Sequence, residues 1–270
     1  MPSAQSNSEC GIRNSELRVT SLKLYSDSKR LTVFKIYSAL GPLALGPVVY
    51  KGLIDIYKAV IFDLDGTLLD TLGDLHAAVN HALRFFGFPE RSLEEVRRFI
   101  GNGVVKLMQR STPEGTDEET DKKCLDSFRE YYLAHMQDMT APYEGVIPLI
   151  EKLRERGIKT AVVSNKLHQA VYELCLDYFP GLIDEAIGVS VEAERKPSPV
   201  NVYKALEKMG VTADECIYIG DSEVDVQTSH NAGVKCIGVT WGFRAREELV
   251  EAGAEVICDN CESIMDIIVD

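Results

Sequence analysis

The sequence predicts an α/β protein with a three-layer, Rossmann-like core around a central parallel sheet and an α-helical domain inserted into that core. Two observations carry this prediction. From residue 59 onward, short apolar runs alternate with amphipathic stretches, the pattern of consecutive βαβ units. One interval, residues 72–140, breaks the alternation and contains only helical patterns, which makes it too long for a simple crossover.

The order of these patterns sets the expected elements. Strands are expected at 59–63, 159–164, 184–189, 215–220 and 235–239, with a weaker sixth pattern at 255–258. Core helices are expected at 146–156, 167–178, 199–209, 223–232 and 245–252. Right-handed crossovers would place the carboxyl ends of all the strands on one rim of the sheet.

The inserted segment has helical patterns of its own, at 72–86, 92–100, 103–111 and 117–137. Its first helix carries an apolar face, formed by Leu72, Leu75, Val79, Leu83 and Phe86. We therefore expect a core of residues 58–71 and 141–270, and a cap of residues 72–140 that sits above the rim, excludes water and selects the substrate.

Residues 1–57 differ in composition from the rest of the chain and are expected to form a poorly ordered extension. An apolar stretch at 36–50 contains Pro42 and Pro47, and it is shorter than the ~20 residues that a membrane-spanning helix needs. It also comes after a long polar segment and lacks a small-x-small cleavage site, so a signal peptide is not expected.

Charge and composition limit the partners. The chain has 270 residues, 45% of them hydrophobic and 26% charged, the balance of a globular protein. Its net charge is −13, and residues 1–58 carry eight basic against four acidic side chains, so the acidic excess lies in the rest. An acidic body argues against nucleic acid as a partner, but a cation in a pocket still permits a small anionic substrate.

Seven cysteines, an odd number mostly placed in apolar segments, suggest reduced thiols in a cytoplasmic protein. Cys258 and Cys261 form a lone CxxC pair. We interpret this pair as a strand-to-helix junction in preference to a zinc or redox site.

The first strand leads directly into Asp63-Leu64-Asp65-Gly66-Thr67. Gly66 allows a sharp turn, and two close carboxylates repel each other unless a cation or a proton is shared between them. An EF-hand calcium loop is excluded, since Leu68 occupies its required glycine position and a strand-like run precedes it. The remaining alternative is a strand end with solvated acids.

Two later strand ends carry groups suited to phosphate. Ser164 and Asn165, followed by Lys166, open the helix after the second strand, although Ser164 could simply cap that helix. Lys196 precedes a Pro-Ser-Pro segment that would hold its ammonium at the rim, although a solvated lysine is the common alternative.

A further carboxylate pair, Asp221 and Asp225, follows the strand at 215–220. Four residues apart at a helix start, the two would share a face, and Asp221 could point toward Asp63. Helix capping by Asp221 is the alternative. Magnesium prefers a few carboxylates and other oxygen ligands, so Asp63, the main-chain carbonyl of Asp65 and Asp221 make a plausible Mg²⁺ site.

Taken in order, these motifs resemble those of the haloacid dehalogenase (HAD) superfamily of phosphotransferases, across residues 59–270. Finer details resemble its phosphoglycolate phosphatase branch, namely the segments 69–75, 100–104 and 240–242. The resemblance implies that Asp63 is the nucleophile that forms an aspartyl-phosphate and that Asp65 is the general acid and base. It also implies the remaining roles: metal binding by Asp63, Asp65 and Asp221 with Asp225 behind them, and substrate binding by Thr67, Ser164, Asn165, Lys196 and the cap residues Gly101, Asn102 and Gly103.

The function that the resemblance implies is hydrolysis of a small phosphomonoester, 2-phosphoglycolate above all, by a monomer or homodimer. A dehalogenase is disfavoured because a halide leaves without a proton, so Asp65 would be idle. A β-phosphoglucomutase-like mutase is disfavoured because mutase relatives have His where Leu75 stands, one residue before His76. A sugar-phosphate phosphatase, a pyrophosphatase and a catalytically silent protein-binding module remain open.

Overall fold

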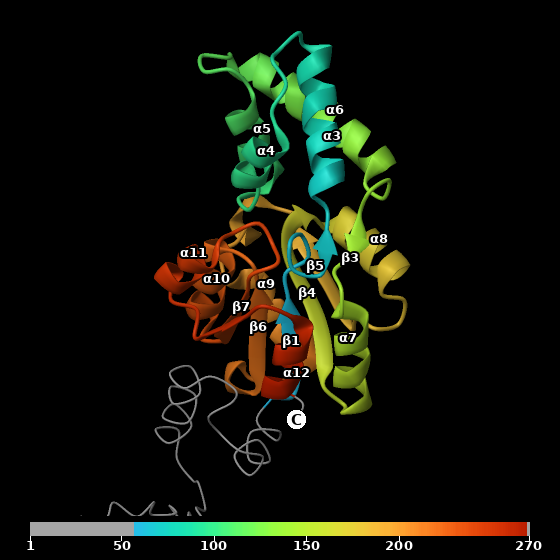
Figure 1. Cartoon of the computed structure of the whole chain (residues 1–270), viewed down its shortest axis with the longest axis vertical. Coiled ribbons are helices and arrows are strands. Elements are labelled where there is room, and N and C mark those ends of the chain that lie inside the picture. The colour runs from blue at the N-terminus through green and yellow to red at the C-terminus, as the bar shows by residue number, and fades with distance from the viewer. Residues whose placement is uncertain (1–56, 269–270) are drawn as a thin grey trace, which may run out of the picture.

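The computed structural model describes residues 57–268, which form a parallel sheet covered by helices on both faces, with a helical insertion at one end (Figure 1). The sheet has six strands in the order β5-β4-β1-β6-β7-β8, all parallel. Its strands are β1 (Ala59–Phe62), β4 (Lys159–Leu167), β5 (Glu185–Val189), β6 (Cys216–Gly220), β7 (Lys235–Val239) and β8 (Val256–Cys258). The predicted fold class is confirmed.

Side-chain alternation along β1 explains why both faces of the sheet are covered. Val60 and Phe62 belong to one hydrophobic core cluster, while Ala59 and Ile61 belong to the other. The first cluster is closed by α7 (Val146–Glu155), α8 (His168–Tyr178) and α12 (Cys261–Ile268). The second is closed by α9 (Val200–Met209), α10 (Glu223–Ala232) and α11 (Arg246–Ala252). Because helices bury both faces, the central strands β1 and β6 are continuous apolar runs.

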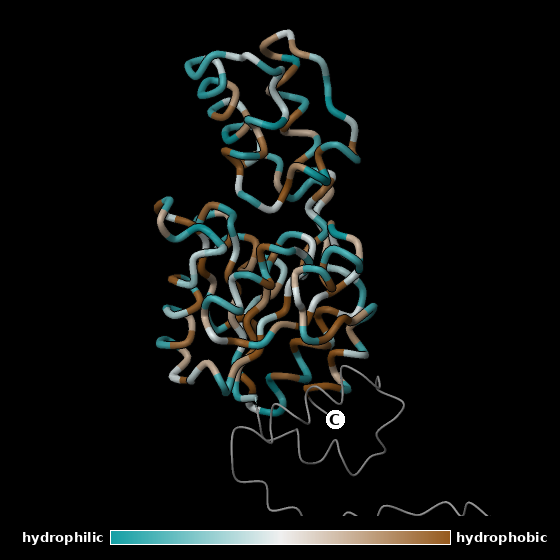
Figure 2. The backbone as a smooth tube through the Cα atoms, turned by 90° about the vertical axis from the view of Figure 1, so that its left-hand side faces the viewer, coloured by the Kyte–Doolittle hydropathy of each residue, from teal (hydrophilic) through white to brown (hydrophobic). Residues whose placement is uncertain are grey.

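The helical insertion, which we call the cap, consists of α3 (Leu72–Phe85), α4 (Leu93–Phe99), α5 (Gly103–Ser111) and α6 (Glu118–His135). It leaves and rejoins the core through β2 (Leu69–Asp70) and β3 (Ala141–Pro142), which pair as a short antiparallel ladder. Figure 2 shows the cap as a separate lobe above the core, joined to it at this neck. Leu72, Leu75, Val79 and Leu83 are buried as the pattern indicates, whereas Phe86, the fifth residue of the expected face, follows the end of α3 and is half-buried.

Most element boundaries lie within about two residues of those expected, and three differences are larger in kind. β4 continues through Leu167, three residues beyond its expected end, so Ser164, Asn165 and Lys166 lie in the strand and neither open nor cap α8. The β2–β3 ladder and α12 were not expected at all. α12 lies against α7, and Ile264, Ile267 and Ile268 are buried in the first core cluster.

The expectations for the N-terminal extension, including the apolar stretch at 36–50, fall outside the described residues. Within residues 57–268, no helix combines the length and the apolar character needed to cross a bilayer.

Candidate active site

The chain turns sharply where β1 ends, and this turn sends the two carboxylates of the Asp-Leu-Asp motif to different partners. Asp63 still donates its main-chain N–H to the carbonyl of Ile219 at 2.9 Å, so it extends the pairing of β1 with β6 by one residue. Gly66 then has φ +87°, and a Cβ atom there would come within 2.4 Å of Asp221 Oδ2. Only glycine permits both this backbone conformation and this close approach.

Asp63 faces a buried lysine that also binds a second carboxylate. Lys196 Nζ lies 2.8 Å from Asp63 Oδ1 and 2.6 Å from Asp225 Oδ1, and all three residues are buried. Asp225 is further held by Ser222, whose hydroxyl and main-chain N–H donate to Oδ2, and by the Tyr218 hydroxyl. Lys196 therefore has a fixed position between two carboxylates, in place of a solvated one.

Burial without solvent gives these groups unusual protonation equilibria. Burial raises the pKa of Asp63 to about 7, with Asp225 adding to the shift and Lys196 opposing it. For Lys196, burial alone would lower the pKa, but Asp225 and Asp63 raise it well above its ordinary value. Lys196 therefore stays protonated. A further cation near Asp63 would favour the ionised form of that carboxyl group.

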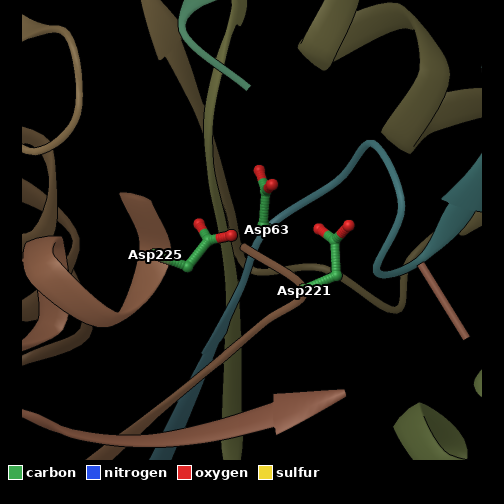
Figure 3. Close-up of side chains that lie close together, drawn as sticks. All are labelled: Asp63, Asp221 and Asp225. Carbon is green, nitrogen blue, oxygen red and sulfur yellow. The ribbon is translucent and has the colours of Figure 1, made fainter. Parts of the chain in front are cut away.

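Asp221 completes an acidic cluster with Asp63 and Asp225 at the end of the sheet (Figure 3). One carboxylate oxygen from each of the three lies within 4.8 Å of the others. Asp221 accepts hydrogen bonds from the Thr67 hydroxyl at 3.2 Å and from the Phe243 N–H at 2.7 Å. Burial, Asp225 and Asp63 all raise the pKa of Asp221 well above its ordinary value.

This cluster has the features of a divalent-cation site. Its ligand atoms are carboxylate oxygens, which hard cations prefer. Among the described residues, the buried Asp63 Oδ1 has an ion pair with Lys196 but no partner in hydrogen-bond geometry. A cation would satisfy that atom and relieve the mutual repulsion of Asp63 and Asp221. Asp225 is engaged on both oxygens by Lys196, Tyr218 and Ser222, so Asp63 and Asp221 are the carboxylates better placed to bind a cation.

Asp65 turns away from this cluster to a second buried lysine. Lys166 Nζ lies 2.8 Å from Asp65 Oδ1, and the Thr71 hydroxyl donates to the same oxygen at 2.8 Å. Thr71 immediately precedes the first cap helix, and the ring of Tyr132 in α6 lies over Lys166, 4.6 Å from Nζ to the ring centroid. The position of Asp65 is therefore linked to the cap, whereas that of Asp63 is set within the core.

A small cavity of about 50 Å³ lies between the rim of the sheet and the cap. Asp63, Asp65, Ser164, Lys196 and Asp221 line it from the core side. The cap contributes an apolar wall, formed by Leu75, Ile100, Val104 and Leu107. A cavity of this size admits only a small molecule, and Lys166, Lys196 and Arg244, which also line it, offset the charge of the three carboxylates.

The cap closes over this cavity through the loop at residues 100–103, which the core holds by its main-chain carbonyls. Asn165 donates to the carbonyl of Gly101 at 3.0 Å and Arg195 to that of Asn102 at 3.1 Å. Arg244 donates to the carbonyl of Ile100 at 2.6 Å. Asn165 lies near the end of β4, and Arg195 and Arg244 lie in the loops that follow β5 and β7, so the same rim that carries the carboxylates also holds the cap loop.

The structure brings most of the expected site residues to one cavity, with different contacts for three of them. Thr67 and Asn102 do not line it: the Thr67 hydroxyl donates to Asp221, and the Asn102 side chain accepts from Arg110. The Asn165 side chain lines the cavity but braces the main chain of Gly101 and Lys196. Gly101, Gly103 and Ser164 do line the cavity.

The helix start at Asp221 also differs from expectation. Asp221 precedes α10, and Ser222 caps that helix by accepting a hydrogen bond from the Asp225 N–H. Asp221 and Asp225 thus approach each other from a strand end and a first helical turn, not from one helix face. Ser222, not Asp221, is therefore the residue that caps α10, and the Asp221 side chain belongs to the acidic cluster with Asp63.

Three residues of the site were missed as functional groups by the sequence reasoning. In the sequence, Lys166 is predicted only as part of a helix start, and no local pattern marks Tyr132 or Arg244. Their partners are 101, 34 and 144 residues away along the chain, at Asp65, Lys166 and Ile100. No local pattern reports such pairings.

Cys258 and Cys261 lie at the end of β8 and the start of α12, a strand-to-helix junction. Both thiols are free and buried. Burial raises the pKa of Cys258 to about 12 and that of Cys261 to about 11, which keeps both protonated and unreactive near neutral pH.

Comparison with known proteins agrees with this geometry. The sequence model of the haloacid dehalogenase-like hydrolases matches residues 60–239. The chain belongs to this family of hydrolases. Among curated proteins, it is 32% identical to a phosphoglycolate phosphatase of Pseudomonas putida, over 77% of this chain and 78% of that protein. It is also 33% identical to a phosphoglycolate phosphatase of Aquifex aeolicus, over 69% and 86% of the two chains.

Solved structures support the same relationship. A crystal structure from Lactobacillus delbrueckii has 36% sequence identity and a TM-score of 0.75, and the match covers 80% of this chain and 100% of that one. The structure of CbbY from Rhodobacter sphaeroides in complex with phosphate has 26% identity and a TM-score of 0.65, over 76% and 95% of the two chains.

Proposed function

We propose that the protein is a magnesium-dependent phosphomonoester hydrolase whose substrate is a small phosphorylated metabolite, 2-phosphoglycolate in particular. The observation that carries the proposal is the pairing of two carboxylates with two buried lysines at one rim: Asp63 with Lys196, and Asp65 with Lys166. The names of the curated relatives support the substrate, and the small cavity under the cap suits it.

In this proposal Asp63 is the nucleophile. Its carboxylate attacks phosphorus, the bond to the leaving oxygen breaks, and an aspartyl-phosphate forms on Asp63. Lys196 stabilises the negative charge beside the nucleophile, and the Ser164 hydroxyl at the cavity wall binds a phosphoryl oxygen. Because Lys196 is fixed by Asp225, its charge is in place before the substrate arrives.

Asp65 is proposed as the general acid and base. It protonates the leaving oxygen in the first step and removes a proton from the attacking water in the second. Thr71 and Lys166 both contact its Oδ1, which orients the carboxylate. Hydrolysis of the aspartyl-phosphate then releases inorganic phosphate and regenerates Asp63.

We propose Mg²⁺ as the cation, held by Asp63, Asp221 and the main-chain carbonyl of Asp65, with Asp225 behind them. Bound there, it would offset the negative charge shared by the phosphoryl group and its carboxylate attacker. Thr67 supports this site from outside by fixing Asp221 through its hydroxyl.

A phosphosugar mutase of the same fold would need an acid-base histidine near the cavity. His76, one residue away from the expected mutase position, contacts the carbonyl of Arg91 at 3.0 Å and Asn80 at 3.0 Å within the cap. It does not line the cavity. This placement favours hydrolysis over return of the phosphoryl group to a sugar.

The six described cysteines are free, which supports a reducing, cytoplasmic location in this proposal. A monomer or homodimer is proposed as the working state, to be checked by sedimentation. No nucleic acid or membrane takes part.

The test is a panel of small phosphoesters, including 2-phosphoglycolate, glucose 6-phosphate, pyrophosphate and p-nitrophenyl phosphate, compared by kcat/KM with magnesium present. We expect release of inorganic phosphate and the highest kcat/KM for 2-phosphoglycolate. Asp63→Asn is the blank, because it keeps the shape of the side chain and removes the nucleophile. Absence of phosphate release from every ester would refute the enzyme, and a far higher kcat/KM for a sugar phosphate would refute only the named substrate.

A further inference from the structure

Arg244 is a buried cation that lines the same cavity as the proposed catalytic groups. It follows β7 and is 9% exposed. The preceding residue, Phe243, donates its main-chain N–H to Asp221 at 2.7 Å. Arg244 therefore directly follows a residue that binds a carboxylate of the acidic cluster. On its other side, it contacts the cap loop at Ile100. The guanidinium therefore lies between the acidic cluster and the cap.

The hydrogen bonds of Arg244 leave part of its donor capacity open. Nε donates to Glu223 at 3.0 Å, one Nη donates to the carbonyl of Ile100 at 2.6 Å, and the other donates to that of Arg97 at 3.3 Å. A guanidinium has five N–H donors, and these bonds use three. Among the described residues, the remaining two N–H groups have no partner of their own, one on each terminal nitrogen.

The other two cations that line the cavity are already committed. Lys196 is shared between Asp63 and Asp225, and Lys166 is paired with Asp65. Both lysines are buried inside the site. Arg244 instead has its counterion, Glu223, at the protein surface, where the Glu223 side chain is 36% exposed. Solvent weakens that ion pair, so Arg244 keeps more of its positive potential for the cavity than either lysine does.

The glycine opposite Arg244 keeps this position open. A Cβ atom at Gly101 would come within 3.1 Å of a terminal nitrogen of Arg244, and φ at Gly101 is +117°. A side chain there would press on the guanidinium and cover its approach to the cavity. The wall beyond, at Ile100 and Val104, is apolar and offers no other partner for an anion.

We propose that Arg244 binds a second anionic group of the substrate, a carboxylate, at the end of the molecule away from the phosphoryl group. This inference rests on the proposed phosphatase function and assigns the residue that selects its substrate. The phosphoryl group lies at Asp63 and Lys196, and the carboxylate accepts hydrogen bonds from the two remaining N–H groups of Arg244. A small phosphoester with a carboxylate satisfies both ends, whereas one with a hydroxyl or an ammonium does not.

Three esters of one size separate charge recognition from catalysis: 2-phosphoglycolate, 2-hydroxyethyl phosphate and O-phosphoethanolamine, whose free ends are anionic, neutral and cationic. For the wild type, we expect kcat/KM to fall in that order. In Arg244→Gln, we expect kcat/KM for 2-phosphoglycolate to fall about ten- to a hundredfold, mainly through KM, since a charge-assisted hydrogen bond is lost. The value for 2-hydroxyethyl phosphate should change less than about threefold.

The matched control is Arg195→Gln. Arg195 also donates to the cap loop, at Asn102, but it does not line the cavity and is held by Glu192 through two nitrogens. Its loss should change both esters by the same factor and leave their ratio at the wild-type value. The ratio of two kcat/KM values is independent of the fraction of enzyme that is folded, so partial misfolding of Arg244→Gln does not obscure the result. Arg244→Lys, which keeps the charge without the fork, should have an intermediate ratio.

Two outcomes would overturn the proposal and leave the phosphatase intact. One is a wild type that does not prefer the carboxylate over the hydroxyl. The other is an Arg244→Gln variant that lowers both esters by the same factor, as a purely structural brace of the cap loop would. A wild type that hydrolyses none of the three esters, nor p-nitrophenyl phosphate, would instead refute the proposed function, and this inference with it.

Discussion

The two pairs that a buried lysine forms with a carboxylate of the site have the same distance and differ in what surrounds them. Lys196 and Asp63 are 2.8 Å apart, and their further partner, Asp225, belongs to the core. Lys166 and Asp65 are also 2.8 Å apart, but their further partners are Thr71, at the entrance to the cap, and Tyr132, within it. The partners of Asp63 thus all belong to the core, whereas the partners of Asp65 include residues of the cap and of its entrance.

This difference fits the chemistry proposed for each side. A nucleophile and its counterion need a constant geometry, which a rigid sheet edge provides. An acid-base group must act on a leaving oxygen only after water has been excluded, so a link to the cap ties its orientation to closure. Substitutions on the two sides should therefore have different consequences, and, apart from the loss of Asp63 itself, the largest is expected at Asp65.

Substitution of the cap-side carboxylate should separate leaving groups. In Asp65→Asn, we expect kcat for an alkyl phosphate such as 2-phosphoglycolate to fall about 10²–10⁴-fold, because its leaving alkoxide needs a proton. For p-nitrophenyl phosphate the fall should be much smaller, because that leaving group departs as a stable anion. Steady-state rates with the two esters provide the measurement, and equal losses for both would contradict the role of Asp65.

Removal of the core-side lysine should cost stability as well as activity. Lys196→Met leaves Asp63 and Asp225 buried without their cation, so we expect the free energy of unfolding to fall by about 3–5 kcal/mol. Urea denaturation without divalent cations measures it. Lys58→Met, which breaks an exposed ion pair with Glu215, is the control and should cost less than about 1 kcal/mol.

A double substitution distinguishes unpaired charge from lost packing at this position. Lys196→Met combined with Asp225→Asn removes the repulsion between Asp63 and Asp225, and it should recover part of the lost stability. If the double variant is as unstable as the two single losses added together, charge pairing is not what holds the core side.

The acidic cluster should make stabilisation by magnesium depend on pH. Without a cation, the pKa of Asp63 is about 7 in the folded protein, above the 3.8 of an ordinary aspartate. The folded state therefore binds more protons between these values, and its stability falls as pH rises through that window. Magnesium binds the ionised carboxylates, so we expect it to raise Tm by at least ~3 °C more at pH 8 than at pH 5.5.

Thermal unfolding in EDTA and in magnesium at both pH values measures this effect. Asp63→Asn removes the titrating group and should make the magnesium shift small at both values. An equal magnesium shift for the wild type at pH 5.5 and pH 8 would exclude the acidic cluster as the binding site.

The smallest effect is expected at the cap side. Tyr132→Leu removes the aromatic ring over Lys166, a cation–π contact worth about 0.5–2 kcal/mol, and should lower kcat by up to about tenfold. Tyr132→Phe keeps the ring and should resemble the wild type, since the Tyr132 hydroxyl has no hydrogen-bond partner among the described residues. Identical kcat values for the Leu and Phe variants would show that the ring does not position Lys166.

The sequence was sufficient to predict the core side of this comparison but not the cap side. Asp63, Lys196 and Asp221 each follow a strand or lie beside a proline, so parallel topology alone brings them to one rim. Lys166 and Tyr132 meet only through the packing of α6 above the sheet, and Arg244 reaches Ile100 across the same gap. Such contacts depend on how two domains are placed, which no periodicity encodes.

The fold shows the same division. β1 and β6 are unbroken apolar runs and β7 is apolar after Lys235, and the bounds of all three agree with expectation within one residue. α12 was missed because its first residue, Cys261, was considered only as part of a CxxC pair. The β2–β3 ladder is too short to produce any alternation, and it exists because the two chain segments of the neck run side by side.

The central claim, that Asp63 becomes phosphorylated, can be tested on the intermediate itself. Acid quenching during turnover of 2-phosphoglycolate, followed by borohydride reduction, converts a phosphorylated aspartate to homoserine, which mass spectrometry of the peptides then locates. The account predicts homoserine at position 63 in the wild type and none in Asp63→Asn. Homoserine at position 65 or 221, or steady release of phosphate with no reduced aspartate trapped at any time, would contradict it.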